Sequence, residues 1–178
     1  MSRADLIAEI RATASRHDEA ACTLIAVHSF AAAAEQVCLA IEALAGYFVG
    51  SRARTPSKGS VLAFARRYLP DLGTTDPGLA LGRRPHTRVG SCAEVVYEAF
   101  RGGLFHQGAL ASGMEVVDDK QRWMLSFEAD GSARLNVIPF QAQFERGLKA
   151  FLRDLKRDGA LAAKAGRRSA FLARTFLR

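Results

Sequence analysis

Apolar residues recur at helical spacing through the first third of the chain. Residues 3–16 show this pattern over a short stretch and predict one amphipathic helix. Asp18 can cap a second, alanine-rich helix that continues to about Val49 and ends near Gly50. Its apolar positions are Leu24, Val27, Ala31, Cys38, Ile41, Leu44 and Phe48. A long helix of this kind usually packs against an antiparallel partner.

Serine residues mark the start of two further helices. Ser57 or Ser60 can cap a third helix. Ser91 can cap a fourth, which we expect to continue through Leu104, and Glu94 completes an S-x-x-E capping box there.

The pattern changes after Gly108. Residues 122–126 and 134–138 alternate apolar and polar side chains on either side of Asp130-Gly131, which is a strong signal for a hairpin turn. These segments predict a small two-stranded ribbon. Pro139 then suits the first turn of a fifth helix.

The elements together predict a mainly all-α fold. We expect an antiparallel helical bundle of about five to six helices, with a small β-hairpin insertion near 122–138. Gly159 ends the fifth helix, so the expected division is a helical domain over 1–158 and a basic C-terminal helix or tail over 159–178.

Composition indicates which partners and which cellular compartment suit the chain. The chain of 178 residues has 25 basic and 18 acidic residues, so its net charge of +7 makes nucleic acid or a membrane surface a plausible anionic partner. Cys22, Cys38 and Cys92 show no disulfide or zinc spacing; they are typical of small core residues in a reducing cytoplasm.

The N-terminus lacks a signal-peptide pattern. The most apolar stretch, residues 20–49, contains Glu35 and Glu42, which favours a buried helix of a soluble cytoplasmic protein over a transmembrane segment. His28 lies among apolar neighbours in this stretch and is expected to be a buried structural histidine.

The segment that carries candidate chemistry is Y-E-A-F-R-G-G-L-F-H-Q-G, residues 97–108. It resembles the HEPN superfamily, whose signature is R-x(4–6)-H on a late helix of an all-α bundle. Arg101 and His106 fit that signature with four residues between them, and Tyr97 and Glu98 supply the aromatic and acidic residues before the arginine.

The resemblance implies a metal-independent endoribonuclease without a cofactor, in a toxin, phage-defence or RNA-processing role. The RNA's own 2′-OH would attack the adjacent phosphorus and leave a cyclic phosphate. Arg101 would bind the phosphate and stabilise its developing charge, and His106 would act as general acid or base. Two protomers place their motifs face to face in this family, so a homodimer is implied, and a toxin would also have an antitoxin as protein partner.

The residue types suit this chemistry. Histidine titrates near neutral pH and can give or take a proton, while arginine offers planar, permanently charged donors to phosphate oxygens. On a helix the two residues are about 7.5 Å apart along the axis.

Other interpretations of the motif stay open. Catalytic members usually have a polar residue, often asparagine, directly after the arginine, and this chain has Gly102 there. The alternative function is therefore a non-catalytic HEPN-like module that binds RNA, a nucleotide or a protein. Arg101 could instead pair with Glu98, and His106 could bond the last helix carbonyls of an unrelated helical interaction protein.

Two basic segments lie outside the motif. Arg83, Arg84 and Arg88 belong to a breaker-rich loop, residues 73–90, and could contact RNA phosphates or simply be solvated. The segment 160–178 could lie along RNA or an anionic membrane, or cover the core with its arginine heads in water. No carboxylate spacing indicates a metal site.

Overall fold

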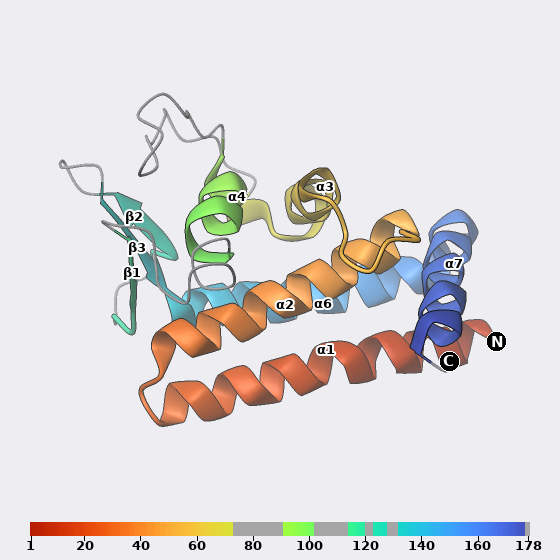
Figure 1. Ribbon diagram of the computed structural model, residues 1–178, viewed down its shortest axis with the longest axis horizontal. Coiled ribbons are helices and arrows are strands. Elements are labelled where there is room, and N and C mark those ends of the chain that lie inside the picture. Colours follow the sequence, from red (N-terminus) through yellow and green to blue (C-terminus); the bar gives the residue numbers. More distant parts are fainter. Residues whose placement is uncertain (73–90, 102–113, 120–122, 128–131, 177–178) are drawn as a thin grey trace.

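Three long helices form the frame of the molecule (Figure 1). The computed structural model describes residues 1–72, 91–101, 114–119, 123–127 and 132–176. Helices α1 (Arg3–Ala26), α2 (Phe30–Val49) and α6 (Val137–Arg157) lie side by side, with α2 antiparallel to α1 and parallel to α6. The mainly α-helical fold with a small β insertion is thereby confirmed.

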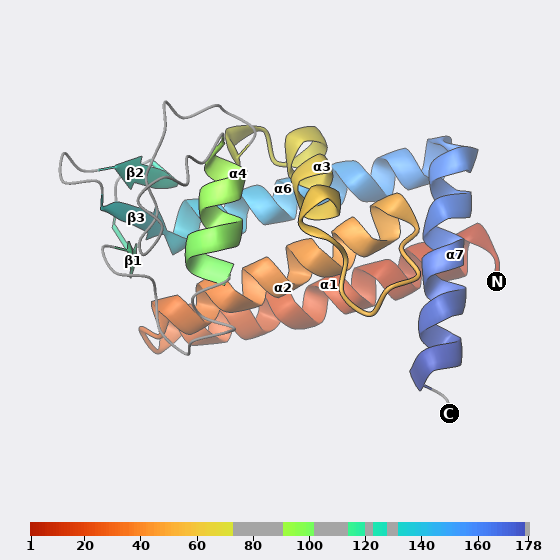
Figure 2. The same ribbon diagram turned by 45° about the horizontal axis from the view of Figure 1, so that its top comes forward.

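Shorter elements cover one side and both ends of this frame. Helix α3 (Lys58–Tyr68), the 3-10 turn η1 (Pro70–Leu72) and helix α4 (Cys92–Val95) lie over α2 on the side away from α1 (Figure 2). Helix α7 (Gly159–Phe176) crosses one end, and a small sheet stands at the other. The chain between α3 and α4 falls largely in the undescribed segment 73–90.

The predicted break between the first two helices is wrong. The structure has one continuous helix through His17 and Asp18, because Ala14 and Ala21 are buried and prolong the apolar stripe that Ile10 carries. The chain reverses later, at residues 27–29, where the Ser29 N–H donates to the Leu24 carbonyl oxygen.

His28 sits at the tip of this reversal. Its φ of 59° lies in the left-handed region, which histidine adopts more readily than β-branched or bulky apolar residues. Its side chain is exposed and its ring contacts Phe30 edge-on at 5.6 Å between centroids. The expectation of a buried structural histidine is therefore wrong, because the position belongs to a turn and not to a helix face.

Helix α2 is the central helix, with contacts to α1, α3, α6 and α7. It ends at Gly50, as predicted. By length and hydropathy it is also the one helix of the described residues that could cross a bilayer, but 61% of its most apolar window is buried by neighbouring elements, as in a core helix.

An aromatic cluster joins α2, α3 and α6. The rings of Phe48, Phe64, Tyr68 and Phe151 lie 5.1 to 6.4 Å apart, mostly edge to face. Phe64 and Phe151 have no solvent exposure. The Tyr68 hydroxyl reaches the cluster's edge and donates to Asp154 at 3.2 Å, and burial raises its pKa to about 12. This cluster ties the two sides of the frame together.

The predicted hairpin is confirmed but is part of a larger sheet. Strand β2 (Leu125–Phe127) pairs antiparallel with β3 (Ala133–Asn136), and β1 (Met114–Val117) pairs parallel with the other edge of β3. Strand β1 was not predicted, since four residues are too few to establish an alternation. Helix α6 follows β3 directly and holds Pro139 in its first turn, as predicted.

Helix α7 carries one buried arginine, whereas Arg167 and Arg174 are exposed, as in the interpretation of a helix with its arginine heads in water. Arg168 is 4% exposed, and its guanidinium donates to the carbonyl oxygens of Ser51, Ala53 and Arg54. Gly46 leaves room for it, because a Cβ there would lie 3.0 Å from the Arg168 Nε. The arginine holds the loop after α2, which no pattern within α7 itself could predict.

Candidate functional site

The motif helix begins where the sequence predicted. The Ser91 side chain accepts a hydrogen bond from the Glu94 N–H at 3.3 Å and starts α4. Helix α4 has only four residues and continues without interruption into the segment η2, Val96–Arg101. The motif residues Tyr97, Glu98 and Arg101 lie in this second segment.

Segment η2 is a π-helical turn and not the regular α-helix that was expected. In a π-helix each N–H donates to the carbonyl five residues earlier, which widens the turn. Such turns are rare, occur mostly singly within α-helices and are frequent at functional sites. Arg101 is the last residue of the turn.

The structure describes the backbone of Arg101 but not its side chain. His106 lies outside the described residues, as do Gly102 and the three loop arginines Arg83, Arg84 and Arg88. The arrangement of these predicted site residues therefore stays a prediction. The described part of the site is the helix that leads to Arg101 and the elements against which that helix packs.

A small apolar cavity lies beneath the π-helical turn. Its volume of about 20 Å³ is enough for roughly one water molecule. Val96 and Tyr97 form part of its wall with Ala93 of α4, and the other lining residues come from α2, α3 and η1: Cys38, Ile41, Glu42, Val61, Ala65 and Leu72.

Glu42 is the polar residue that sequence reasoning missed in this wall. It is 7% exposed, although carboxylates are rarely buried to this extent. Glu42 belongs to no pair of carboxylates whose spacing predicts a metal site. A signal was nevertheless present, because Glu42 follows Cys38 by four residues and precedes Ala45 by three, and both neighbours are buried on the same face of α2.

An ion-pair cluster fixes the outer side of the motif helix. Lys58, the first residue of α3, lies 2.7 Å from the Glu98 carboxylate and 3.6 Å from that of Glu94. The hydrogen bond to Glu98 raises the pKa of Lys58 and keeps its ammonium charged. Glu98, which the sequence offered as a partner for Arg101, is thus already bonded to another helix.

The remaining titratable side chains of the described ranges do not gather into a metal site: no three histidine, cysteine or acidic residues come together there. Of the described histidines, His17 contacts Gln36 at 3.0 Å and His28 occupies the α1–α2 turn. Cys38 is buried in the cavity wall, Cys92 is half-buried, and Cys22 is exposed, so the expectation of three core cysteines holds for one of them in full.

Comparison with known proteins gives no relatives: no family model matches the chain, and no curated protein and no solved structure is significantly similar to it.

Proposed function

We propose that this protein is a HEPN-like endoribonuclease that cleaves RNA without a metal ion and works as a homodimer. The observation that carries the proposal is the twelve-residue motif 97–108, with Arg101 and His106 five positions apart. Two features of the structure support it. The motif begins on a capped helix of a mainly α-helical bundle, and the helix widens into a π-helical turn that ends at Arg101.

The proposed reaction needs two groups. The RNA 2′-OH gives up its proton and attacks the adjacent phosphorus, the 5′-oxygen leaves with a proton, and a 2′,3′-cyclic phosphate remains. His106 serves as the proton donor or acceptor, and Arg101 binds the phosphate oxygens as their charge grows. Two motifs from two protomers complete one cleft. A toxin, phage-defence or RNA-processing role fits such an activity.

Cleavage of total RNA and tRNA by the purified protein in EDTA tests the proposal. We expect products with cyclic phosphate ends from the wild type and a loss of roughly 10²- to 10⁴-fold in rate for His106→Ala, the usual contribution of general acid–base catalysis. His28→Asn is the matched control, since it removes an exposed histidine at a position where asparagine adopts the same backbone. Undiminished cleavage by His106→Ala would overturn the role of His106.

A second function is favoured by Gly102, which replaces the polar residue usual after the arginine in catalytic members. In this reading the protein is a non-catalytic HEPN-like module that binds RNA, a nucleotide or a protein partner. A folded, dimeric wild type that shifts RNA in a gel and leaves it intact would establish this function in place of the first.

A further inference from the structure

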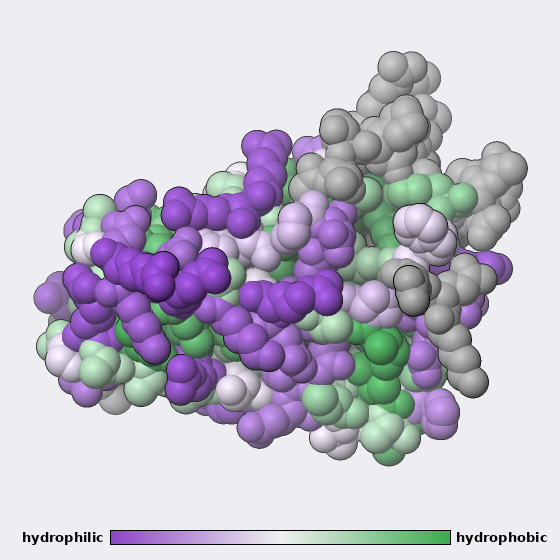
Figure 3. Space-filling view, turned by 180° about the vertical axis from the view of Figure 1, so that it is seen from behind, coloured by the Kyte–Doolittle hydropathy of each residue, from purple (hydrophilic) through white to green (hydrophobic). Residues whose placement is uncertain are grey.

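The positive charge of the chain is concentrated at its C-terminal end. Residues 137–178 contain ten basic and three acidic residues, whereas residues 1–136 contain fifteen of each. The whole net charge of +7 therefore belongs to the last quarter of the sequence. Helix α6 carries part of it, and Figure 3 shows strongly hydrophilic side chains gathered on the rear face of the molecule.

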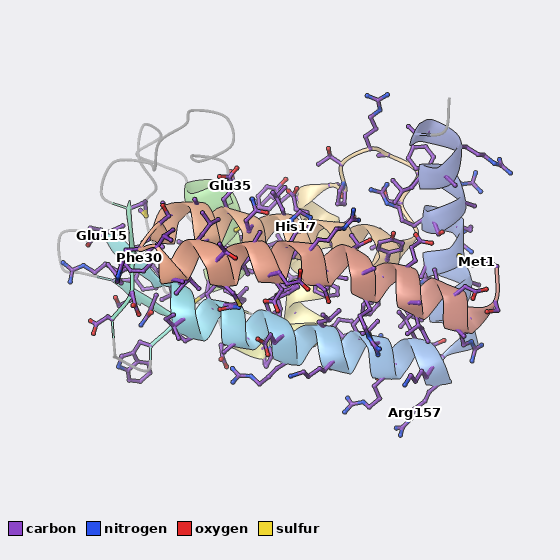
Figure 4. The ribbon with its side chains drawn as sticks, turned by 90° about the horizontal axis from the view of Figure 1, so that it is seen from below. Met1, His17, Phe30, Glu35, Glu115 and Arg157 are labelled. Carbon is purple, nitrogen blue, oxygen red and sulfur yellow. The ribbon has the colours of Figure 1, made fainter. Side chains whose placement is uncertain are left out.

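This charge borders a groove between α1 and α6. Two adjoining depressions of about 500 and 440 Å³ share Arg11 and Lys156 in their walls. Figure 4 shows the two helices side by side on this face, with Met1 and Arg157 at one end. The basic side chains that line the groove are Arg3, Arg11, Lys149, Arg153 and Lys156, and the acidic ones are Asp18 and Glu145.

The acids do not neutralise these cations. Lys149 pairs with Glu145 at 3.4 Å and Arg153 lies 3.8 Å from Asp154, but Arg11 and Lys156 have no carboxylate within ion-pair distance among the described residues. The Arg3 guanidinium donates to the Lys156 carbonyl oxygen at 3.0 Å, so it bridges the two helices and keeps its charge. Even with Asp154 counted beside the lining residues, five cations against three acids leave an excess of positive charge at one groove.

We infer that this groove binds the sugar–phosphate backbone of single-stranded RNA. Its basic residues span about 10–12 Å along each helix, at ~1.5 Å per residue. A positively charged groove that follows the backbone is a common feature of proteins that bind single-stranded nucleic acid. Leu148 and Leu152 add apolar surface between the cations. Contacts of this kind read charge and not sequence.

A membrane surface fits this face less well. Membrane-binding faces combine cations with exposed apolar side chains. Of the exposed large apolar residues in the described ranges, Met1 alone lies at the Arg157 end of the two helices (Figure 4), whereas Val27 lies at the α1–α2 turn, and Trp123 and Ile138 lie near the sheet. These three stand at the opposite end of the frame from the Lys156 end of the groove.

The groove and the motif helix lie on opposite sides of the frame, so this inference does not depend on the proposed cleavage. Binding is measured by fluorescence anisotropy with a labelled 2′-O-methyl oligouridine. This probe lacks the attacking hydroxyl, so a failure of cleavage cannot alter the result, and His106→Ala should bind it like the wild type.

The decisive variant is Arg11→Gln with Lys156→Gln. We expect the Kd at 0.1 M salt to rise roughly 10- to 30-fold and the slope of log Kd against log salt to fall by about 1.4, from about 0.7 counterion released per neutralised phosphate. The matched control, Arg66→Gln with Arg174→Gln, removes two exposed charges outside the groove and should bind nearly as the wild type does.

Equal weakening by both double variants would overturn the groove assignment, because it would reduce binding to net charge. Absence of oligouridine binding by the folded wild type would overturn the inference altogether. Groove-dependent binding to phosphatidylglycerol vesicles, without binding to the oligouridine, would replace RNA by a lipid surface.

Discussion

The two sides of the helical frame use their charges in different ways. On the side of the motif, Lys58 pairs with both Glu94 and Glu98, and this cluster joins α3 to the motif helix. On the side of the groove, Arg11 and Lys156 have no such partners among the described residues. Paired charges hold helices together, whereas charges left in excess at a concave surface are available to a ligand.

Both sides nevertheless depend on one core. Phe151 projects from α6, the helix that borders the groove, into the aromatic cluster formed by Phe48, Phe64 and Tyr68. The two sides therefore differ in the charges on their surfaces, but the same aromatic core stabilises both.

The largest effect is expected from Phe151→Ala, which would break the shared core. The side chain is fully buried, so its removal should cost about 3–5 kcal/mol of the free energy of unfolding. Urea denaturation followed by circular dichroism measures this loss. Trp123→Ala is the control, because Trp123 is 72% exposed and should change stability by about 0.5 kcal/mol or less.

The same experiment decides whether the two sides are coupled. A single cooperative transition, shifted to lower urea, is the expected result. Two separate transitions would show that the motif side and the groove side unfold independently, and the idea of one common core would then be wrong.

A smaller effect is expected from Gly147→Ala, which would push the two sides apart. Gly147 lies where α6 meets the end of α3, and a Cβ there would lie 2.6 Å from the Leu69 Cδ2 and 2.8 Å from the Tyr68 carbonyl oxygen. Overpacking of this kind costs about 1–3 kcal/mol. Calorimetric measurement of Tm tests it.

Gly166→Ala is the matched control for that substitution. Gly166 also lies inside a helix, but a Cβ there meets nothing within 4 Å. Alanine should stabilise α7 by up to about 1 kcal/mol through its helix propensity. A Tm for Gly147→Ala that equals or exceeds that of the wild type would mean that α6 and α3 do not pack as closely as the structure indicates.

The sequence could predict features that depend on residues close together along the chain. The caps at Ser57 and Ser91, the hairpin and Pro139 were all predicted, because each depends on residues only a few positions apart. The α1–α2 reversal was misplaced, since His17 and Asp18 resemble a helix start locally and only the burial of Ala14 and Ala21 shows that the helix continues.

Features that depend on distant partners could not be predicted. Arg168 is buried because carbonyl oxygens more than a hundred residues earlier accept its hydrogen bonds. The π-helical turn likewise packs over Glu42 and Cys38 of α2. The candidate motif is the opposite case: its identity rests on local spacing alone, while the side chains of Arg101 and His106 lie outside the described residues.

The smallest effect is expected from Lys58→Gln, which tests the contrast between the paired charges of the motif side and the excess charge of the groove. The side chains of Lys58 and Glu98 are 40% and 42% exposed, so the pair should contribute only about 0.2–1 kcal/mol. Because Glu98 raises the pKa of Lys58, this contribution is complete below the ordinary lysine pKa and is lost as the pH rises through the raised one. The free energy of unfolding of wild type and variant, measured at low salt and neutral pH and again at 1 M salt, tests this, since salt should remove the difference.

Lys149→Gln is the counterpart on the groove side. It removes only the exposed pair with Glu145, so its stability should stay close to that of the wild type while its affinity for oligouridine falls. Lys58→Gln should leave that affinity almost unchanged. If Lys58→Gln weakened oligouridine binding as much as Lys149→Gln does, the strand would also contact the motif side, and the two surfaces would form one continuous binding path around the frame.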